Sequence, residues 1–563
     1  MMEDPRAQRW LTRARSAWSQ AAQMRQYYER VAEMFYPERM EFYTRGQSDG
    51  RDNTSRLFDG EAVLLRQELA DGFGGMLRPR SQDWFYIRAK PLELNDDASV
   101  QMWLDHANER LREALYRPRT RFETAMRDND HDFVTFGVSF LSVTLNRARD
   151  GFLFRCPHPR DMAFELDDED EPSILYEELR LTPLQAEALF RGVQLPRHIL
   201  EAVEQARRSG TTGSERRLSV WRVICPREEH EWRQQPPSHA TVASLYIDPV
   251  TGQFLAEAHM RVNPYQVRRW QTVVSGEVWG RSPCTAAALA DARTLNTAQR
   301  ALLEGLEKAI DPPMGASDKV LGSEINLYAG GVTYLGDVDD VHRHFRPIQD
   351  GARVDYGLQF TQERRQFLSR AMRQNLLRLP EEREMTAYEA SQRVEEWIRN
   401  AAPVFEPMQA FNADLMERVF SLALYDINNR AGLFDPPPEQ LGEITWEFED
   451  RLAEAKRKRK LYRTREFEQE MTTFAQVASG GDPQMARQYL ALVDWNEVLA
   501  AKREAYPAKW FKAPEQATED IERIEMEQGG QRLLEMAQNA PPELLQMGLA
   551  QLEGATGEIP TAA

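Results

Sequence analysis

The sequence predicts an α+β protein in which helices predominate. Three observations lead to this class. Apolar residues recur at helical spacing over several long stretches, and short β-branched and aromatic stretches gather between residues 133 and 271. Proline and glycine pairs separate the two kinds of stretch. With 563 residues the chain is long enough for several domains.

The first part of the chain has a helical pattern. Residues 10–43 are amphipathic and rich in aromatic side chains until Pro37, which ends the helix. A second helical pattern carries glycines at positions 72, 74 and 75, which loosen its end. We therefore expect helices within 10–43, over Asp59–Met76 and over Ala98–Leu115.

The region that follows has the residue types of strands. Phe133–Leu145 is short, β-branched and aromatic, so the whole segment is predicted to be a strand. A turn at Asp150-Gly151 and an acidic loop at Asp167–Glu171 come next. We expect further strands near Leu218–Cys225, Thr241–Ile247 and Phe254–Val262, and small helices at Leu184–Arg191 and Arg197–Arg208.

Two helices are predicted to enclose a small β segment. Ser282-Pro283 supplies an N-cap and a proline at the first helical position, and the helix runs to Ile310. Residues 314–360 have no helical period. Within them Val320–Leu335 alternates like a strand pair, and Val341–Ile348 is a candidate for a third strand. Thr361 is expected to cap the second helix, which ends at Leu379 before Pro380.

The longest helical stretch runs from Thr386 to Ala431. Pro403 and Pro407 lie inside it, so it should be kinked or split there. A charged helix over Asp450–Ala478 follows, and the last ten residues are expected to be disordered.

Composition sets limits on function. Lys and Arg number 71 against 89 Asp and Glu, a net charge of −18, which is enough by itself to keep a large protein soluble. The three cysteines lie far apart, which fits a reducing compartment. No run of about 18 apolar residues and no signal peptide occur, so we expect a soluble protein without membrane contact.

Motifs for catalysis and metal binding are absent. The dipeptide Gly-Lys never occurs, which excludes a P-loop, and no GxSxG, HExxH or EF-hand pattern is found. His342 and His344 fit a surface strand better than a metal site. The acidic run Asp167–Glu171 fits a solvated loop better than a cation site, and the basic run Lys456–Lys460 fits a solvated helix or intersubunit ion pairs better than a DNA contact. We predict no cofactor, no metal and no enzymatic activity.

Five motifs occur in an order that resembles the head-to-tail connecting (portal) proteins of short-tailed bacteriophages, the podovirus type. The family pattern "D-x-x-A … LASGL … L-x-P-x-x-x-WF" is similar to Asp59–Ala62, 69–73 and Leu77 to Phe85. The remaining similarities are Phe136–Val143, the "GE-x-x-GRSP … LN" pattern at Gly276–Asn296, the pair Pro312-Pro313, and "MTA-x-E" at Met385–Glu389. The similarity covers about residues 10–450. Asp71 and Phe73 depart from the usual small or aliphatic residues.

The resemblance implies a portal-protein fold with a β-containing wing, two stem helices, a small β clip, a long kinked helix and a helical C-terminal crown. It implies the following layout: an N-terminal wing at 1–281, a first stem helix at 282–313, a clip at 314–360, a second stem helix at 361–379, a channel loop at 380–386, the long kinked helix at 387–435, wing and crown helices at 436–515, and a helical tail at 516–563 with a disordered end.

The resemblance also places a DNA channel. The loop between the second stem helix and the long helix would project into it, and Glu381, Glu382, Arg383 and Glu384 would form a mostly negative collar that lets DNA slide. The alternative is a solvent-exposed turn on an outer rim. Arginines of the preceding helix would form cationic rings, or would instead pair with acidic residues of the neighbouring stem: Arg364, Arg365, Arg370, Arg373 and Arg378.

The implied function is a ring, with twelve subunits the expected number, at one capsid vertex. It would conduct double-stranded viral DNA during packaging and ejection and would hold the tail. Twelve copies would carry 12 × −18 = −216 charges. The implied partners are the terminase packaging motor, the major capsid and scaffolding proteins and the tail adaptor proteins, with assembly in the host cytoplasm and a final place in the virion. The alternative is a DNA-processing or packaging enzyme subunit whose active site has no recognisable motif.

Overall fold

The computed structural model describes residues 4–43, 52–80, 82–90, 97–209, 217–232, 237–311, 314–316, 345–347, 354–374, 387–425, 437–478 and isolated positions between 433 and 502. Two compact units divide the chain. The first is Met1–Glu384 with Gln392–Glu454, and the second is Met385–Ser391 with Ala455–Ala563. Helices predominate over strands, so the α+β class is confirmed.

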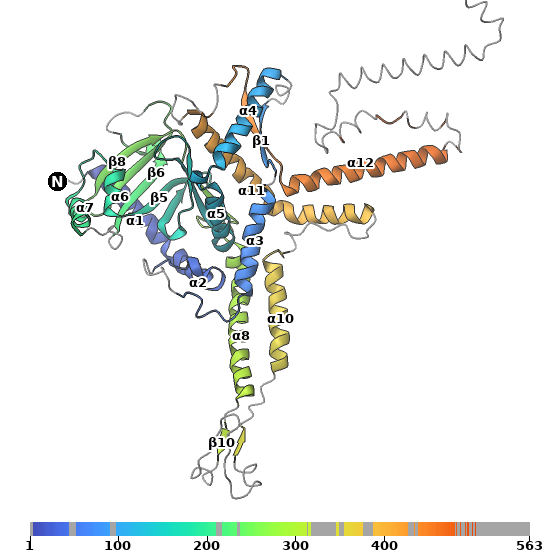
Figure 1. Ribbon diagram of the computed structural model, residues 1–563, viewed down its shortest axis with the longest axis horizontal. Coiled ribbons are helices and arrows are strands. Elements are labelled where there is room, and N and C mark those ends of the chain that lie inside the picture. Colours follow the sequence, from blue (N-terminus) through green and yellow to red (C-terminus); the bar gives the residue numbers. More distant parts are fainter. Residues whose placement is uncertain are drawn as a thin grey trace, which may run out of the picture. The chain divides into compact units, whose positions relative to one another are not determined.

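Among the N-terminal helices of the first unit (Figure 1), those within residues 5–77 differ from the prediction at their ends, whereas the one over Ala98–Leu115 matches it. The pattern expected to start at residue 10 begins at Pro5, because the Asp4 carboxylate accepts the backbone N–H of Arg6 and caps the helix. It breaks at Ala21 into two helices, and Pro37 then starts a 3₁₀ turn. The elements are α1 (Pro5–Gln20), α2 (Ala22–Phe35), η1 (Pro37–Arg39), α3 (Glu61–Leu77) and α4 (Ala98–Leu115).

The strand predicted over Phe133–Leu145 is wrong in its first half. Helix α5 (Phe122–Phe136) extends through this part, and Gly137, with φ +78°, ends it in the left-handed conformation that glycine adopts at low cost. Strand β2 (Val138–Leu145) then begins. It pairs with β3 (Phe152–Arg155) and β9 (Tyr265–Arg269) in an antiparallel sheet of order β3-β2-β9.

A five-stranded antiparallel meander follows the chain order. Its strands are β4 (Met162–Leu166), β5 (Pro172–Leu181), β6 (Leu218–Pro226), β7 (Val242–Asp248) and β8 (Gln253–Met260). Alternation decides which face each side chain covers: Val223 and Cys225 pack with α1, whereas Ile224 packs with α2 on the other face. Helices α6 (Pro183–Leu189) and α7 (Arg197–Ser209) cover a further part around Val220.

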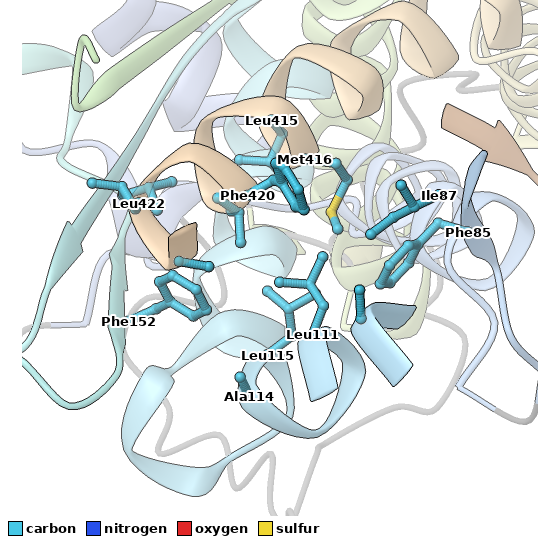
Figure 2. Packing of buried hydrophobic residues seen from close by; sticks show 14 of the residues in the cluster. Phe85, Ile87, Leu111, Ala114, Leu115, Phe152, Leu415, Met416, Phe420 and Leu422 are labelled. Carbon is cyan, nitrogen blue, oxygen red and sulfur yellow. The ribbon is translucent and has the colours of Figure 1, made fainter. Parts of the chain in front are cut away.

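A second hydrophobic core joins segments far apart in sequence. Strand β1 (Phe85–Lys90) pairs antiparallel with β12 (Glu443–Phe448), a strand in a region predicted to be helical, so that prediction is wrong. Figure 2 shows side chains of β1, α4, β3 and α11 (Ala387–Tyr425) converging on this core, among them Phe85, Leu111 and Met416. Burial of large side chains, at about 1.5–3 kcal/mol each, makes this contact a main source of stability.

Two helices of the first unit, α8 (Leu289–Ile310) and α10 (Val354–Ala371), lie side by side (Figure 1). We call this pair the stem. A π-helical turn (Cys284–Ala288) precedes α8, and the short antiparallel pair β10 (Met314–Ala316) and β11 (Phe345–Pro347) lies at the far end. The rest of 314–353, with most of the expected clip strands, falls outside the described residues.

The second stem helix starts earlier than predicted. Helix α10 begins at Val354 and ends at Ala371, rather than spanning 361–379. Thr361 is no N-cap: it is buried inside the helix, and its hydroxyl donates to the Leu358 carbonyl oxygen at 2.9 Å. A mid-helix threonine can satisfy its hydroxyl in this way, so a capping residue type alone does not mark a helix start.

Helix α11 remains one helix through Pro403 and Pro407, and Figure 1 shows it bent, as a proline inside a helix requires. In the second unit the structure describes chiefly α12 (Arg451–Ala478), whose first residues belong to the first unit. This helix matches the charged helix predicted over 450–478. Most of 479–563 lies outside the described residues.

Candidate functional site

The predicted site residues divide into two groups. Arg378 and the acidic loop residues Glu381, Glu382, Arg383 and Glu384 lie outside the described residues, so their placement stays a prediction. Arg370 and Arg373 lie at the end of α10 and are exposed. Arg373 has φ +51°, at the point where the helix ends.

The other two arginines of α10 have partners within their own chain. The Arg364 guanidinium donates to Asp291 of α8 at 3.0 Å, and Arg365 donates to Asp59 at 2.7 Å. The Asp59 side chain is only 3% exposed, and its hydrogen bond raises the pKa of Arg365. Arg364 and Arg365 therefore form ion pairs within the chain itself.

Arg370 and Arg373 have no ion-pair partner among the residues that the structure describes. The Arg370 guanidinium lies 5.9 Å from the centre of the exposed Phe367 ring. Arg364 and Arg365 are therefore held by carboxylates, whereas Arg370 and Arg373 have exposed side chains.

The two stem helices run antiparallel and approach closely. Asp291 near the start of α8 meets Arg364 late in α10, while Leu302 later in α8 meets Gly357 early in α10. A Cβ atom at position 357 would lie 3.1 Å from Leu302 Cγ, and closer still to its methyl group, so glycine allows this contact.

The root of the stem is fixed by a polar clamp. The Asn296 side chain on α8 accepts the backbone N–H of Phe58 at 2.6 Å and of Asp59 at 3.2 Å, and donates to the Arg56 carbonyl at 3.1 Å. Together with the Arg365–Asp59 pair, this holds the segment before α3 between α8 and α10. Asp59 and Asn296 belong to the motifs quoted above, but their contacts could not be read from the sequence.

Gly137 and Gly280 allow the segment that precedes the stem to contact the end of α5 closely. A Cβ atom at Gly137 would lie 2.6 Å from the Arg281 carbonyl carbon, and one at Gly280 would overlap the Gly137 carbonyl oxygen. The Ser282 hydroxyl donates to the Thr135 carbonyl at 3.0 Å. The stem therefore starts from a rigid backbone-to-backbone contact.

A buried charge network on α5 was missed by the sequence reasoning. Asp130, 1% exposed, accepts from Arg268 of β9 at 2.8 Å and from Arg78 at the end of α3. Arg78 also reaches Asn412 of α11 at 3.5 Å, and burial lowers the pKa of Arg268. The Asp130 carboxylate therefore joins α5 to β9 and to the end of α3, and Arg78 extends the network to α11. The polar run at 128–132 was the available signal.

A second pair on α5 is similar in kind. Asp132 is fully buried and accepts from Arg39 at 2.5 Å, while burial raises the pKa of Asp132. Burial also raises the pKa of the nearby Cys156 thiol well above its ordinary range, so this thiol is a poor nucleophile. These groups fit a structural network better than a catalytic one.

The remaining sequence candidates have local structural contacts. The Asp167 carboxylate accepts the backbone N–H of Glu169 at 3.0 Å and of Glu171 at 2.9 Å, which closes the acidic loop between β4 and β5. The basic run Lys456–Lys460 lies on α12. In the part of the chain that the structure describes, no three His, Cys, Asp or Glu side chains gather as metal ligands, and no helix is long and apolar enough to cross a bilayer. His342 and His344 lie outside that part.

Among the described residues, these features define an α+β protein whose antiparallel helical stem is joined by polar contacts to a body containing three antiparallel sheets. A family model described as bacteriophage head to tail connecting protein matches residues 7–504, and the chain belongs to that family. The family consists of structural phage proteins and is not a known enzyme family.

Comparisons with individual proteins add less. A solved structure described as the virion of a native gene transfer agent particle is 10% identical, with a TM-score of 0.34 over 77% of this chain and 91% of that one. No curated protein matches the chain. The family assignment therefore rests on the family model.

Proposed function

We propose that this protein forms the portal ring at one vertex of a short-tailed phage capsid. The ring is a conduit for double-stranded DNA during packaging and ejection, and it is the attachment point of the tail. The observation that carries this proposal is the family match over residues 7–504. Twelve is the proposed subunit number, and the finished ring belongs to the virion after assembly in the host cytoplasm.

Exposed apolar side chains on the stem support ring formation. In the single chain Ile310 is 84% exposed and Tyr356 is 61% exposed, and five more large apolar residues of the stem are at least 37% exposed: Leu303, Leu306, Leu358, Phe360 and Phe367. Such a set on two paired helices is costly in water, and neighbouring copies would cover it. Head-to-tail contacts that close on themselves give a ring.

The parts of the chain receive roles under this proposal. Residues 1–281 form the wing that meets capsid and scaffolding proteins, and α8 with α10 forms the stem. Residues 314–353 form the clip, where terminase docks first and tail adaptors later. The loop at 380–386 and the exposed Arg370 and Arg373 face the channel, with the acidic residues repelling phosphate and the arginines making weak, salt-sensitive contacts.

Native mass measurement and negative-stain microscopy of the full chain test the proposal. Rings with a central hole are expected. A folded protein that stays monomeric at high concentration would refute it, and so would a monomer that hydrolyses ATP or cuts DNA, which would favour the enzyme alternative.

A single substitution makes this test sharper. Ile310→Asp places a charge on the proposed contact surface and should shift rings to monomers without unfolding the chain. Met102→Asp on α4, a residue that is 72% exposed, is the matched control and should leave rings intact. If both variants form rings equally well, the stem does not form the contact between subunits.

A further inference from the structure

The turn that leads into the stem has an uncommon geometry. Residues Cys284–Ala288 form a π-helical turn, directly followed by the α-helical Leu289–Ile310. A π-turn holds one residue more than an α-turn, is rare, and is often found where a helix serves a function. Its hydrogen bonds are less favourable than those of an α-helix, so something outside the turn must stabilise it.

A side chain from α2 supplies that support. The Tyr27 hydroxyl donates a hydrogen bond to the Thr285 carbonyl oxygen inside the turn. Thr285 also holds the entry of the turn, because its hydroxyl accepts the backbone N–H of Ser282 at 2.7 Å. Thr285 therefore makes two hydrogen bonds that lie outside the backbone hydrogen-bond pattern of the helix, one with Tyr27 and one with Ser282.

Both flanks of the turn are fixed, so its geometry sets the rotation of α8. Before it, Ser282 is bonded to Thr135, and after it Asn296 clamps residues 56–59 and Asp291 pairs with Arg364. If the π-turn became an α-turn with the same residues, α8 would rotate by about 100° and shift by about 1.5 Å. Asn296 and Asp291 would then lose their partners.

We propose that this turn is a register switch for the stem, with Tyr27 as the residue that holds it in the π state. In that state Asn296 reaches residues 56–59 and Leu306 and Ile310 occupy their observed exposed positions. Release of Tyr27 allows the α state, in which α8 is rotated and the clamp on residues 56–59 is open. The proposal concerns the single chain and does not require ring formation.

Two buried cysteines provide the measurement. Cys284 lies in the π-turn and Cys225 in β6, both are buried, and burial raises the pKa of each thiol to about 12. Alkylation of each cysteine, followed by mass spectrometry of the full-length protein, therefore compares local opening of the turn with opening of the sheet.

Tyr27→Phe removes the hydroxyl donor and keeps the ring. We expect Cys284 to be alkylated about tenfold faster, the effect of losing one hydrogen bond, with Cys225 unchanged and hydrogen exchange increased at residues 52–60. Tyr43→Phe is the matched control, because the Tyr43 hydroxyl also donates to a backbone carbonyl, that of Ala22 at 2.8 Å, but away from the turn. Unchanged Cys284 labelling in Tyr27→Phe, or an equal rise at Cys225, would overturn the proposal.

Deletion of the exposed Ala287 gives an independent test, which can be made even if the Tyr27→Phe variant does not fold. It removes the extra residue, so the turn should become α-helical while α8 keeps its position and residues 52–60 stay protected. Tyr27→Phe should then have no further effect on Cys284. Loss of protection at 52–60 in the deletion variant would contradict the proposed switch, as would a persistent Tyr27→Phe effect.

Discussion

Asp130→Asn should destabilise the first compact unit far more than any surface ion-pair variant. The Asp130 side chain is 1% exposed and accepts from both Arg268 and Arg78, which are themselves almost fully buried. Asparagine keeps the size but removes the charge, leaving two guanidinium groups buried without a counter-ion. Breaking a buried pair in this way costs about 3–5 kcal/mol.

Urea unfolding followed by tryptophan fluorescence measures this cost. Glu123→Gln is the matched control: Glu123 pairs with Arg80 at 3.3 Å, but the two side chains are 52% and 76% exposed, and such pairs contribute about 0–1 kcal/mol. An Asp130→Asn effect within about 1 kcal/mol of this control would refute the reasoning that Asp130 joins α3, α5 and β9.

Three further predictions concern charge. Burial lowers the pKa of His158 and keeps its side chain neutral in the folded state. The folded state therefore binds fewer protons than the unfolded state. The free energy of unfolding should fall by about 1.4 kcal/mol per pH unit as the pH drops below about 6.5. His158→Gln should flatten this decline in urea titrations at pH 7 and pH 5; an unchanged slope would contradict it. Arg365→Gln removes the ion-pair partner of the buried Asp59 carboxylate and should lower the free energy of unfolding, measured by thermal denaturation, by about 1–3 kcal/mol. An unchanged free energy of unfolding would show that the pair is unimportant. Replacing Arg370 and Arg373 together by Gln should leave rings intact and alter DNA packaging rates, whereas loss of rings would assign these residues to subunit pairing.

Local signals in the sequence predicted most of the helices. The range Ala98–Leu115 matches α4 at both ends, and three meander strands, β6, β7 and β8, lie within a few residues of their predicted positions. The class and the helix–β–helix order of the stem region followed from the same local patterns. These features depend on spacing and capping, which a single sequence contains.

Features that depend on distant partners were not predicted. Strand β1 pairs with β12, a partner far away in the sequence. Residues 443–448 alternate polar and apolar side chains as a strand does, so a local signal for β12 was present and was missed, but nothing local indicated the pairing. The clamp of Asn296 on residues 56–59 likewise joins positions about 240 apart. At the candidate site, sequence could name the arginines of α10, but only the fold separated the paired Arg364 and Arg365 from the exposed Arg370 and Arg373.

The pairing of β1 with β12 affects how the chain folds during its synthesis. Residues 85–90 can pair only after residues 443–448 have been synthesised. The core that includes α4 and α11 therefore closes only after most of the polypeptide has left the ribosome. Until then β1 is an unpaired edge beside exposed apolar side chains, the kind of surface on which nascent chains associate wrongly. A product that terminates before residue 443 would keep that edge permanently, and we expect it to aggregate rather than to enter assembly as a shortened subunit.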